Sequence, residues 1–291
     1  MFENVRASRQ LEAHLRDLHS SDSNQRLAAV EALGALGGPH NIDPLVDMLR
    51  DSSPAVRAAA AKALGEISDG RAAPGLLKAL LDNDLSVRTA AGQALSDLTR
   101  DVPVQAAISA LEGQGTFARA VVARTLGKWG DHKAIPSLIN ALGDNEGEIR
   151  KVVAKALSRL GERAWVIFVD GTYKDFARMA ASGDPRAVAP LLKALEHGDS
   201  SNRAAAARGL ARFEADTVVP HLLTHMKDDN SEVRQSVAEA LGALGDQRAL
   251  EPLLFALDDY EPAVRAAAMV SLDKLDTALQ KRGTAPVGRG A

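Results

Sequence analysis

Apolar and polar positions repeat along this chain with a 31-residue period. Each period contains an arginine followed at offsets +3, +7 and +10 by apolar side chains, and these offsets fall on one side of an α-helix. The arginines are Arg26, Arg57, Arg88, Arg119, Arg150, Arg203, Arg234 and Arg265. The residue at +7 is leucine in every period. The pattern therefore predicts one amphipathic helix per period, beginning close to the arginine.

A second helix precedes the arginine in each period. First-turn prolines such as Pro44, Pro190 and Pro252 begin apolar stripes typical of such a helix. An aspartate six residues before the arginine marks the turn between the two helices at Asp51, Asp82, Asp144, Asp228 and Asp259. One helical pair cannot bury its apolar stripe alone, but stacked pairs can. The sequence therefore predicts an all-α fold, a right-handed α-α superhelix or solenoid of eight helical pairs.

The period breaks once. Arg150 and Arg203 are 53 residues apart, which is one period of 31 plus 22 residues. We therefore predict a single solenoid over residues 1–276, interrupted by an insertion at 162–183 and followed by a flexible C-terminal tail at 277–291. The eight repeats are expected near residues 7–37, 38–68, 69–99, 100–130, 131–161, 184–214, 215–245 and 246–276.

The repeated motif is Gly-Asp-x-Arg-Ala-x-x-Pro-Leu-Leu, followed by an Asp turn, Val-Arg and Ala-Leu-Gly. It is clearest at residues 246–272, 131–157 and 51–65. Over roughly residues 7–276 the chain resembles the short HEAT-like repeats of the phycobilisome-lyase-like type. The resemblance implies that the arginine and aspartate columns pair between helices and stack inside the solenoid. The fourth repeat has Glu112-Gly113-Gln114-Gly115 in place of the aspartate turn, so Arg119 is predicted to lack a partner.

Some enzymes are built on such repeats, but their chemistry is not found in this sequence. Deoxyhypusine hydroxylase carries iron-binding His-Glu pairs where this chain has Leu27-Ala28 and Gln235-Ser236. Bilin lyases bring an aromatic-rich first repeat, whereas residues 25–30 contain no aromatic. His221 and His225 have metal-ligand spacing, but no third ligand is near in sequence and the chain has no cysteine. We therefore predict no catalytic residue, metal, cofactor or small-molecule substrate, and a bilin lyase or chromophore-handling protein is only the third interpretation.

The predicted insertion concentrates aromatic residues, which make up only 3% of the chain. Aromatics at a place where a repeat pattern varies suit an anchor for a partner. The alternative is that they pack back onto the fifth and sixth repeats, because Val166, Ile167 and Val169 also favour burial. The candidate partner-binding residues of the insertion are Trp165, Phe168, Tyr173 and Phe176.

Basic residues gather on the second helices of the fourth, fifth and sixth repeats. The windows 119–128, 150–159 and 203–212 contain lysines and arginines but no acid. Offsets +5 and +9 point away from the apolar stripe, so we expect them on the concave surface of the stack. Both offsets are basic in these three repeats, at Arg124, Lys128, Lys155, Arg159, Arg208 and Arg212. The alternative is a solvated face whose charges are paired by neighbouring turns.

The charge of the whole chain does not select a partner. Lys plus Arg is 35 and Asp plus Glu is 38, which gives a net charge of −3. The local basic patch favours a non-catalytic protein-binding scaffold or adaptor whose concave face holds an acidic segment of another protein. A nucleic-acid-binding helical-repeat protein is the alternative. No signal peptide or long apolar run is visible, so we predict no membrane contact and a cytoplasmic location.

Overall fold

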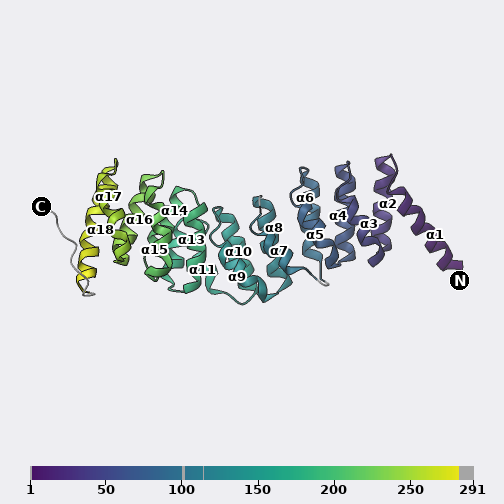
Figure 1. The fold of residues 1–291 in the computed structure, drawn as a ribbon. Coiled ribbons are helices and arrows are strands. Elements are labelled where there is room, and N and C mark those ends of the chain that lie inside the picture. The colour runs from purple at the N-terminus through teal and green to yellow at the C-terminus, as the bar shows by residue number, and fades with distance from the viewer. Residues whose placement is uncertain (1, 100–101, 114, 282–291) are drawn as a thin grey trace. The chain divides into compact units, whose positions relative to one another are not determined.

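A computed structural model describes residues 2–99, 102–113 and 115–281 of the 291-residue chain (Figure 1). Within these residues the fold is all-α, without a β-strand, which confirms the predicted fold class. The α-helices are α1 (Phe2–Asp17), α2 (Ser23–Leu36), α3 (Ile42–Met48), α4 (Pro54–Ile67), α5 (Ala73–Ala79), α6 (Leu85–Asp97), α7 (Val104–Ala110), α8 (Thr116–Trp129), α9 (Ile135–Ala141), α10 (Gly147–Arg159), α11 (Ala164–Phe168), α12 (Lys174–Ala181), α13 (Val188–His197), α14 (Ser200–Leu210), α15 (Ala215–Thr224), α16 (Ser231–Leu244), α17 (Leu250–Phe255) and α18 (Pro262–Lys281). Short 3-10 helices are η1 (Pro39–Asn41), η2 (Gly70–Ala72), η3 (His132–Ala134), η4 (Pro185–Ala187), η5 (His225–Lys227), η6 (Gln247–Ala249) and η7 (Ala256–Asp258).

Each of the eight repeats consists of two helices, called here the A helix and the B helix. The A helices are α1, α3, α5, α7, α9, α13, α15 and α17, and the B helices are α2, α4, α6, α8, α10, α14, α16 and α18. The B helix contains the repeated arginine close to its N-terminus. The helices α11 and α12 come from the predicted insertion and form an additional, shorter pair.

The turns between helices follow from local side-chain chemistry. Asp84 and Asn230 precede α6 and α16, and their side chains accept hydrogen bonds from first-turn N–H groups that have no helical partner. Pro54 occupies the first helical position of α4, where a missing N–H costs nothing. Gly130 and Gly245 end α8 and α16 in the left-handed conformation that glycine adopts without strain. These signals set the length of each repeat.

The helices form two compact units. The first contains Met1–Ser137 together with Arg159–Gly161, and the second contains Leu138–Ser158 together with Glu162–Ala291. In the first unit the B helices α2, α4 and α6 pack in succession, each against its A helix (Figure 1). In the second unit α14, α16 and α18 do the same, and α12 packs against α14.

The core of each unit is the leucine column at offset +7. Leu33 and Leu64 in the first unit and Leu210 and Leu241 in the second have no exposed surface. Small residues let adjacent B helices approach closely. A Cβ atom added at Gly65 would lie 2.8 Å from the Ala94 Cα, so α4 and α6 could not pack as they do with a larger residue there. This close approach accounts for the alanine-rich, aromatic-poor composition.

Candidate functional site

The repeated arginines form a ladder of ion pairs inside each unit. In the first unit the Arg57 Nε donates to Asp82 Oδ2 at 2.7 Å and its Nη2 donates to Oδ1 at 2.9 Å, a bidentate pair that fixes the guanidinium plane. The third nitrogen, Nη1, donates to the carbonyl oxygen of Asp51 at 2.8 Å. In each arginine–aspartate ion pair of the ladder the aspartate stands at offset +25 from its arginine: Arg26–Asp51, Arg57–Asp82, Arg150–Asp175, Arg203–Asp228 and Arg234–Asp259.

The register of this arginine ladder corrects one prediction. Each of these five arginines binds an aspartate 25 residues further along the chain, so the missing aspartate at Gly113 affects Arg88 and not Arg119. Within the described residues Arg88 donates only to the carbonyl oxygens of Asp82 and Asn83. Arg119 is not without a partner, because its Nη1 donates to the Gly113 carbonyl at 3.4 Å. The sequence shows the repeated arginines and the repeated aspartates. Which aspartate each arginine binds depends on how the helices stack.

The ladder shifts the pKa values of its carboxyl groups according to their burial. The hydrogen bonds from Arg26 and Arg57 lower the pKa values of Asp51 and Asp82 below the ordinary value. Arg234 lowers the pKa of Asp259 in the same way. Asp175 differs, because its complete burial raises its pKa despite its hydrogen bond with Arg150.

The predicted insertion, residues 162–183, is a shortened helical pair that takes part in the ladder. Its helix α12 occupies a B-helix position, because Ala180 faces Gly209 of α14 as Gly65 faces Ala94 of α6. In that register Thr172 stands where the other repeats have arginine. Asp175, which lies inside α12, supplies the carboxylate for Arg150. The inserted residues thus continue the stacking of the second unit with a truncated repeat.

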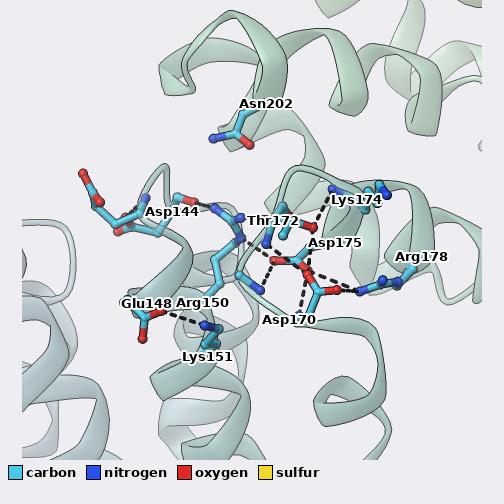
Figure 2. A network of polar contacts seen from close by, with 12 residues as sticks. Asp144, Glu148, Arg150, Lys151, Asp170, Thr172, Lys174, Asp175, Arg178 and Asn202 are labelled. Atoms are coloured by element: carbon cyan, nitrogen blue, oxygen red, sulfur yellow. Dashed lines mark hydrogen bonds and ion pairs between the residues drawn. The ribbon is translucent and has the colours of Figure 1, made fainter.

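Arg150 and Asp175 form the most deeply buried pair of the ladder (Figure 2). Their side chains are 1% and 0% exposed, and the Arg150 Nε to Asp175 Oδ2 distance is 2.8 Å. The Asp175 carboxylate also accepts the backbone N–H groups of Asp170 at 2.8 Å and Gly171 at 3.1 Å. Arg150 completes its hydrogen bonds with the carbonyl oxygens of Asp144 and Thr172. The network ties α10 to the loop before α12.

The turn after α9 also contacts the sixth repeat. Asn145 Oδ1 accepts the N–H of Asp199 at 2.8 Å and the Nδ2 of Asn202 at 2.8 Å. A Cβ atom added at Gly147 would lie 1.9 Å from the carbonyl oxygen of Gly171, so this turn and the loop of the short pair touch through their backbones. The short pair is therefore packed between the fifth and sixth repeats at this end of their helices.

The aromatics predicted to bind a partner have different positions. Phe176 is fully buried, and the guanidinium of Arg150 lies 4.9 Å from its ring centre. Trp165 is 1% exposed, and Arg186 lies 5.7 Å from its ring centre. Tyr173 is 47% exposed at the loop before α12. The Phe168 side chain lies outside the described residues. Tyr173 is thus the described aromatic of this group that a partner can reach.

In the first unit the predicted basic residues lie on the exposed side of α8. Arg124 and Lys128 are both exposed, whereas Thr125, Leu126 and Gly127 between them are buried. Lys128 Nζ lies 3.5 Å from the Asp97 carboxylate of α6 and also donates to the Ser96 carbonyl oxygen. Arg124 has no ion pair within the described residues. Arg159, at the end of α10 in the segment assigned to this unit, is exposed and likewise has no ion pair there.

In the second unit the predicted basic residues lie on α10 and at α14. Lys155, Arg208 and Arg212 are exposed. Arg208 donates to the Ser236 hydroxyl at 2.6 Å and lies 3.5 Å from the Glu232 carboxylate, both on α16. Lys155 and Arg212 have no ion pair among the residues that the structure describes. The short pair contributes two exposed alanines, Ala177 and Ala181, at the corresponding offsets of α12.

His221 and His225, which have metal-ligand spacing, make other contacts in the structure. His225 Nδ1 lies 3.0 Å from the His221 carbonyl oxygen, and His221 Nδ1 lies 3.5 Å from Glu196. Across residues 2–99, 102–113 and 115–281 no cluster of three histidine, aspartate or glutamate side chains could hold a metal ion. In the same ranges no helix combines the length and apolarity needed to cross a bilayer.

The B helices of the first unit carry a groove that the sequence analysis did not predict. It has a volume of about 960 Å³ and is lined by residues of α2, α4 and α6. Its floor consists of small side chains such as Ala58, Ala59 and Ala90. Its charged residues are Glu31, Lys62, Glu66 and Asp97. We call this feature the B-helix groove.

Phe255 is a second feature that the sequence analysis missed. It is 78% exposed at the end of α17, beside a pocket of about 510 Å³ that also contains Leu223 and Met226. A comparison across the 31-residue period could have revealed it. The equivalent positions of the other repeats are all polar or charged: Arg16, Asp47, Lys78, Ser109, Asn140, Lys193 and Thr224.

The comparison with protein families agrees with this repeat architecture. A family model of HEAT repeats matches residues 9–96, 104–181 and 188–273. The second match ends at residue 181 and so includes both helices of the short pair. No curated protein matches the chain.

Several solved structures are similar to the chain at low identity. YibA of Escherichia coli is 21% identical with a TM-score of 0.35, and the match covers 91% of each chain. Human deoxyhypusine hydroxylase is 20% identical with a TM-score of 0.33, covering 94% of this chain and 99% of that chain. The CpcE and CpcF complex of phycocyanin lyase from Nostoc is 20% identical with a TM-score of 0.31, covering 94% and 92%. None of them assigns a function to this chain.

Proposed function

Because the chain belongs to the HEAT-repeat family, we propose that it is a protein-binding scaffold whose exposed B-helix positions hold an acidic segment of a partner. The binding residues of the proposal are the basic residues at offsets +5 and +9 of repeats 4, 5 and 6. We call them the basic positions. They are Arg124, Lys128, Lys155, Arg159, Arg208 and Arg212.

The observation that carries the proposal is the contrast between two sets of arginines and lysines. The ladder arginines are half-buried or buried, and most bind a carboxylate of the chain itself. At the basic positions, Arg124, Lys155, Arg159 and Arg212 are exposed and have no ion pair within the described residues. Exposed cations without internal partners attract an acidic ligand and speed its encounter. Lys128 and Arg208 already bind Asp97 and Glu232, so we assign them a smaller share of the binding.

The energetics require several contacts to act together. One exposed ion pair contributes only about 0.2–1 kcal/mol, so affinity must come from the array of cations and not from any one of them. Binding should weaken as salt rises, because the Debye length falls from about 10 Å at 0.1 M to about 3 Å at 1 M. Tyr173, exposed at the loop before α12, is proposed as an additional apolar contact.

Nucleic acid is the second candidate ligand, because the same cations could bind phosphates. Proteins that bind single strands without sequence preference add aromatic side chains on which the bases stack. The basic positions include no aromatic, and the net charge of the chain is −3. These two features favour an acidic protein segment over nucleic acid.

The test compares two labelled probes with the full chain in one buffer. The probes are an acidic peptide of Glu and Asp separated by Ala, and a single-stranded oligonucleotide of equal charge. We expect micromolar binding of the peptide that weakens with salt, measured by fluorescence anisotropy. Binding of the oligonucleotide alone would replace the proposal by the second candidate, and binding of neither probe would contradict both.

A further inference from the structure

The B-helix groove of the first unit carries the opposite charge to the basic positions. Its four charged residues are three acids, Glu31, Glu66 and Asp97, and one base, Lys62. The three carboxylates and one ammonium give the groove a net charge of −2. These residues occupy the same offsets, +5 and +9, that are basic in repeats 4 to 6. The net charge at these two offsets therefore changes from negative at the groove to positive in repeats 4 to 6.

The carboxylates at the groove are accessible to a ligand. Glu31 is exposed and has no ion pair within the described residues. Glu66 is 54% exposed, and its contact with Lys62 at 3.8 Å is long and solvated. Asp97 is 43% exposed and accepts from Gln93 at 3.0 Å while it contacts Lys128. An arriving cation can reach all three without the displacement of a buried partner.

The floor of the groove is apolar and leaves room for side chains. Ala58 and Ala59 of α4 and Ala90 of α6 are half-buried there. With these small residues, the groove volume of about 960 Å³ lies within the range of sites that hold sizeable ligands. A ligand that combined apolar side chains with positive charges would match both the floor and the rim.

We propose that the B-helix groove binds a cationic segment of a partner protein, with apolar residues between its lysines or arginines. This inference rests on the proposed function, since it treats the B-helix face as the surface that partners occupy. The acids lie one on each of three successive helices, and packed helices are roughly 10 Å apart. An extended chain advances about 3.3 Å per residue, so a basic residue at every third position would meet each helix in turn.

The probe is a labelled peptide of five Lys-Ala-Leu repeats, titrated against the full chain by fluorescence anisotropy. We expect salt-sensitive binding that weakens about tenfold in the double variant Glu31→Gln and Glu66→Gln. The matched control is Asp43→Asn with Asp47→Asn, which removes the same charge from exposed positions of α3 and should leave binding unchanged. A second variant, Ala59→Met with Ala90→Met, fills the floor and should weaken binding without any change of charge.

Three results would overturn the proposal: no binding of the peptide, equal binding by the Gln variant, or equal binding by the floor-filled variant. Circular dichroism of each variant verifies that the helices are intact. The acidic peptide used for the basic positions serves as a parallel probe. Loss of cationic binding with intact acidic binding contradicts only this inference, whereas loss of acidic binding alone contradicts only the proposed function.

Discussion

Asp175 and Asp51 bind equivalent arginines of the ladder at different depths. The Arg150–Asp175 side chains are 1% and 0% exposed, whereas the Arg26–Asp51 side chains are 12% and 6% exposed. Removing one charge from a buried pair leaves the other uncompensated, which costs about 3–5 kcal/mol. We therefore expect Asp175→Asn to destabilise the chain by about 3 kcal/mol and Asp51→Asn by about 1–2 kcal/mol. Urea unfolding followed by circular dichroism measures both, and equal losses would contradict the ranking.

Gly113 marks the gap in the ladder opposite Arg88. The substitution Gly113→Asp restores an aspartate at offset +25, the position at which the other paired arginines find theirs. A hydrogen bond to a charged group contributes about 1.5–3 kcal/mol, part of which is offset because the new Cβ would lie 3.2 Å from the Ala110 carbonyl oxygen. We expect the free energy of unfolding, measured by thermal denaturation, to rise by about 1 kcal/mol. Gly113→Asn adds a side chain of the same size without the charge and should stabilise the chain less. Equal stabilisation by the two substitutions would contradict an ion pair with Arg88.

The lowered pKa values of Asp51, Asp82 and Asp259 predict a loss of stability in acid. A carboxyl whose folded pKa lies below its unfolded pKa stabilises the fold above the unfolded pKa, about 3.9 for aspartate. That contribution disappears as pH falls through the folded pKa. The raised pKa of Asp175 acts with the opposite sign. We expect the unfolding free energy to fall between about pH 5 and 2. The variant Asp82→Asn should make this fall shallower. An unchanged pH dependence in Asp82→Asn would contradict a stabilising Arg57–Asp82 pair.

At this scale the sequence predicted which residues repeat but not how they pair. The arginine and aspartate columns follow from the 31-residue period, which depends only on chemistry within each repeat. The pairing of Arg57 with Asp82, rather than with the nearer Asp51, depends on the stacking of neighbouring repeats. That is why Arg88, and not Arg119, stands opposite the gap at Gly113.

Among the elements, the short pair α11 and α12 explains an irregularity of the sixth repeat. The ladder position six residues before Arg203 holds His197 instead of aspartate. Arg150 does not need an acid there, because Asp175 of the short pair provides the carboxylate. The inserted segment and the missing aspartate are therefore two parts of one arrangement.

Deleting residues 162–183 tests this relation. The deletion restores the 31-residue spacing, but it places His197 opposite Arg150 and leaves that buried guanidinium without a carboxylate. We expect a clear drop in the thermal midpoint, from this loss and from the loss of the buried Trp165 and Phe176. Adding His197→Asp to the deletion should recover part of the drop. Absence of any recovery would mean that Asp175 does not act as the ladder acid.

The sequence predicted the position of this element, because the period breaks there, but not its structure. Four aromatics in one segment suited either a partner or the core. Phe176 and Trp165 lie beneath Arg150 and Arg186, both from flanking helical pairs, and this contact could not be inferred from spacing. Tyr173, in contrast, is exposed at the loop before α12.

For the molecule as a whole, the fold was predictable because each helical pair is a local unit and stability adds up between neighbours. Which of the exposed cations are paired with acids of the chain was less predictable. Lys128 and Arg208 are partly neutralised by Asp97 and Glu232, which come from neighbouring helices and lie outside the windows in which the basic residues were counted. The B-helix groove likewise emerges only on the folded chain, where residues of α2, α4 and α6 come together to line it.

The measurement that tests the central claim most directly is the affinity of the acidic peptide for a charge-reversed chain. The variant is Arg124→Glu, Lys155→Glu and Arg212→Glu, which spares Arg208 because it contacts α16. The control variant reverses Lys78, Lys133 and Lys227, which are exposed outside the B helices and change the net charge equally. We predict at least a tenfold loss of affinity for the first variant and little change for the second, with both folded by circular dichroism. Equal losses in the two variants would show that only net charge matters and would contradict a binding surface at the basic positions.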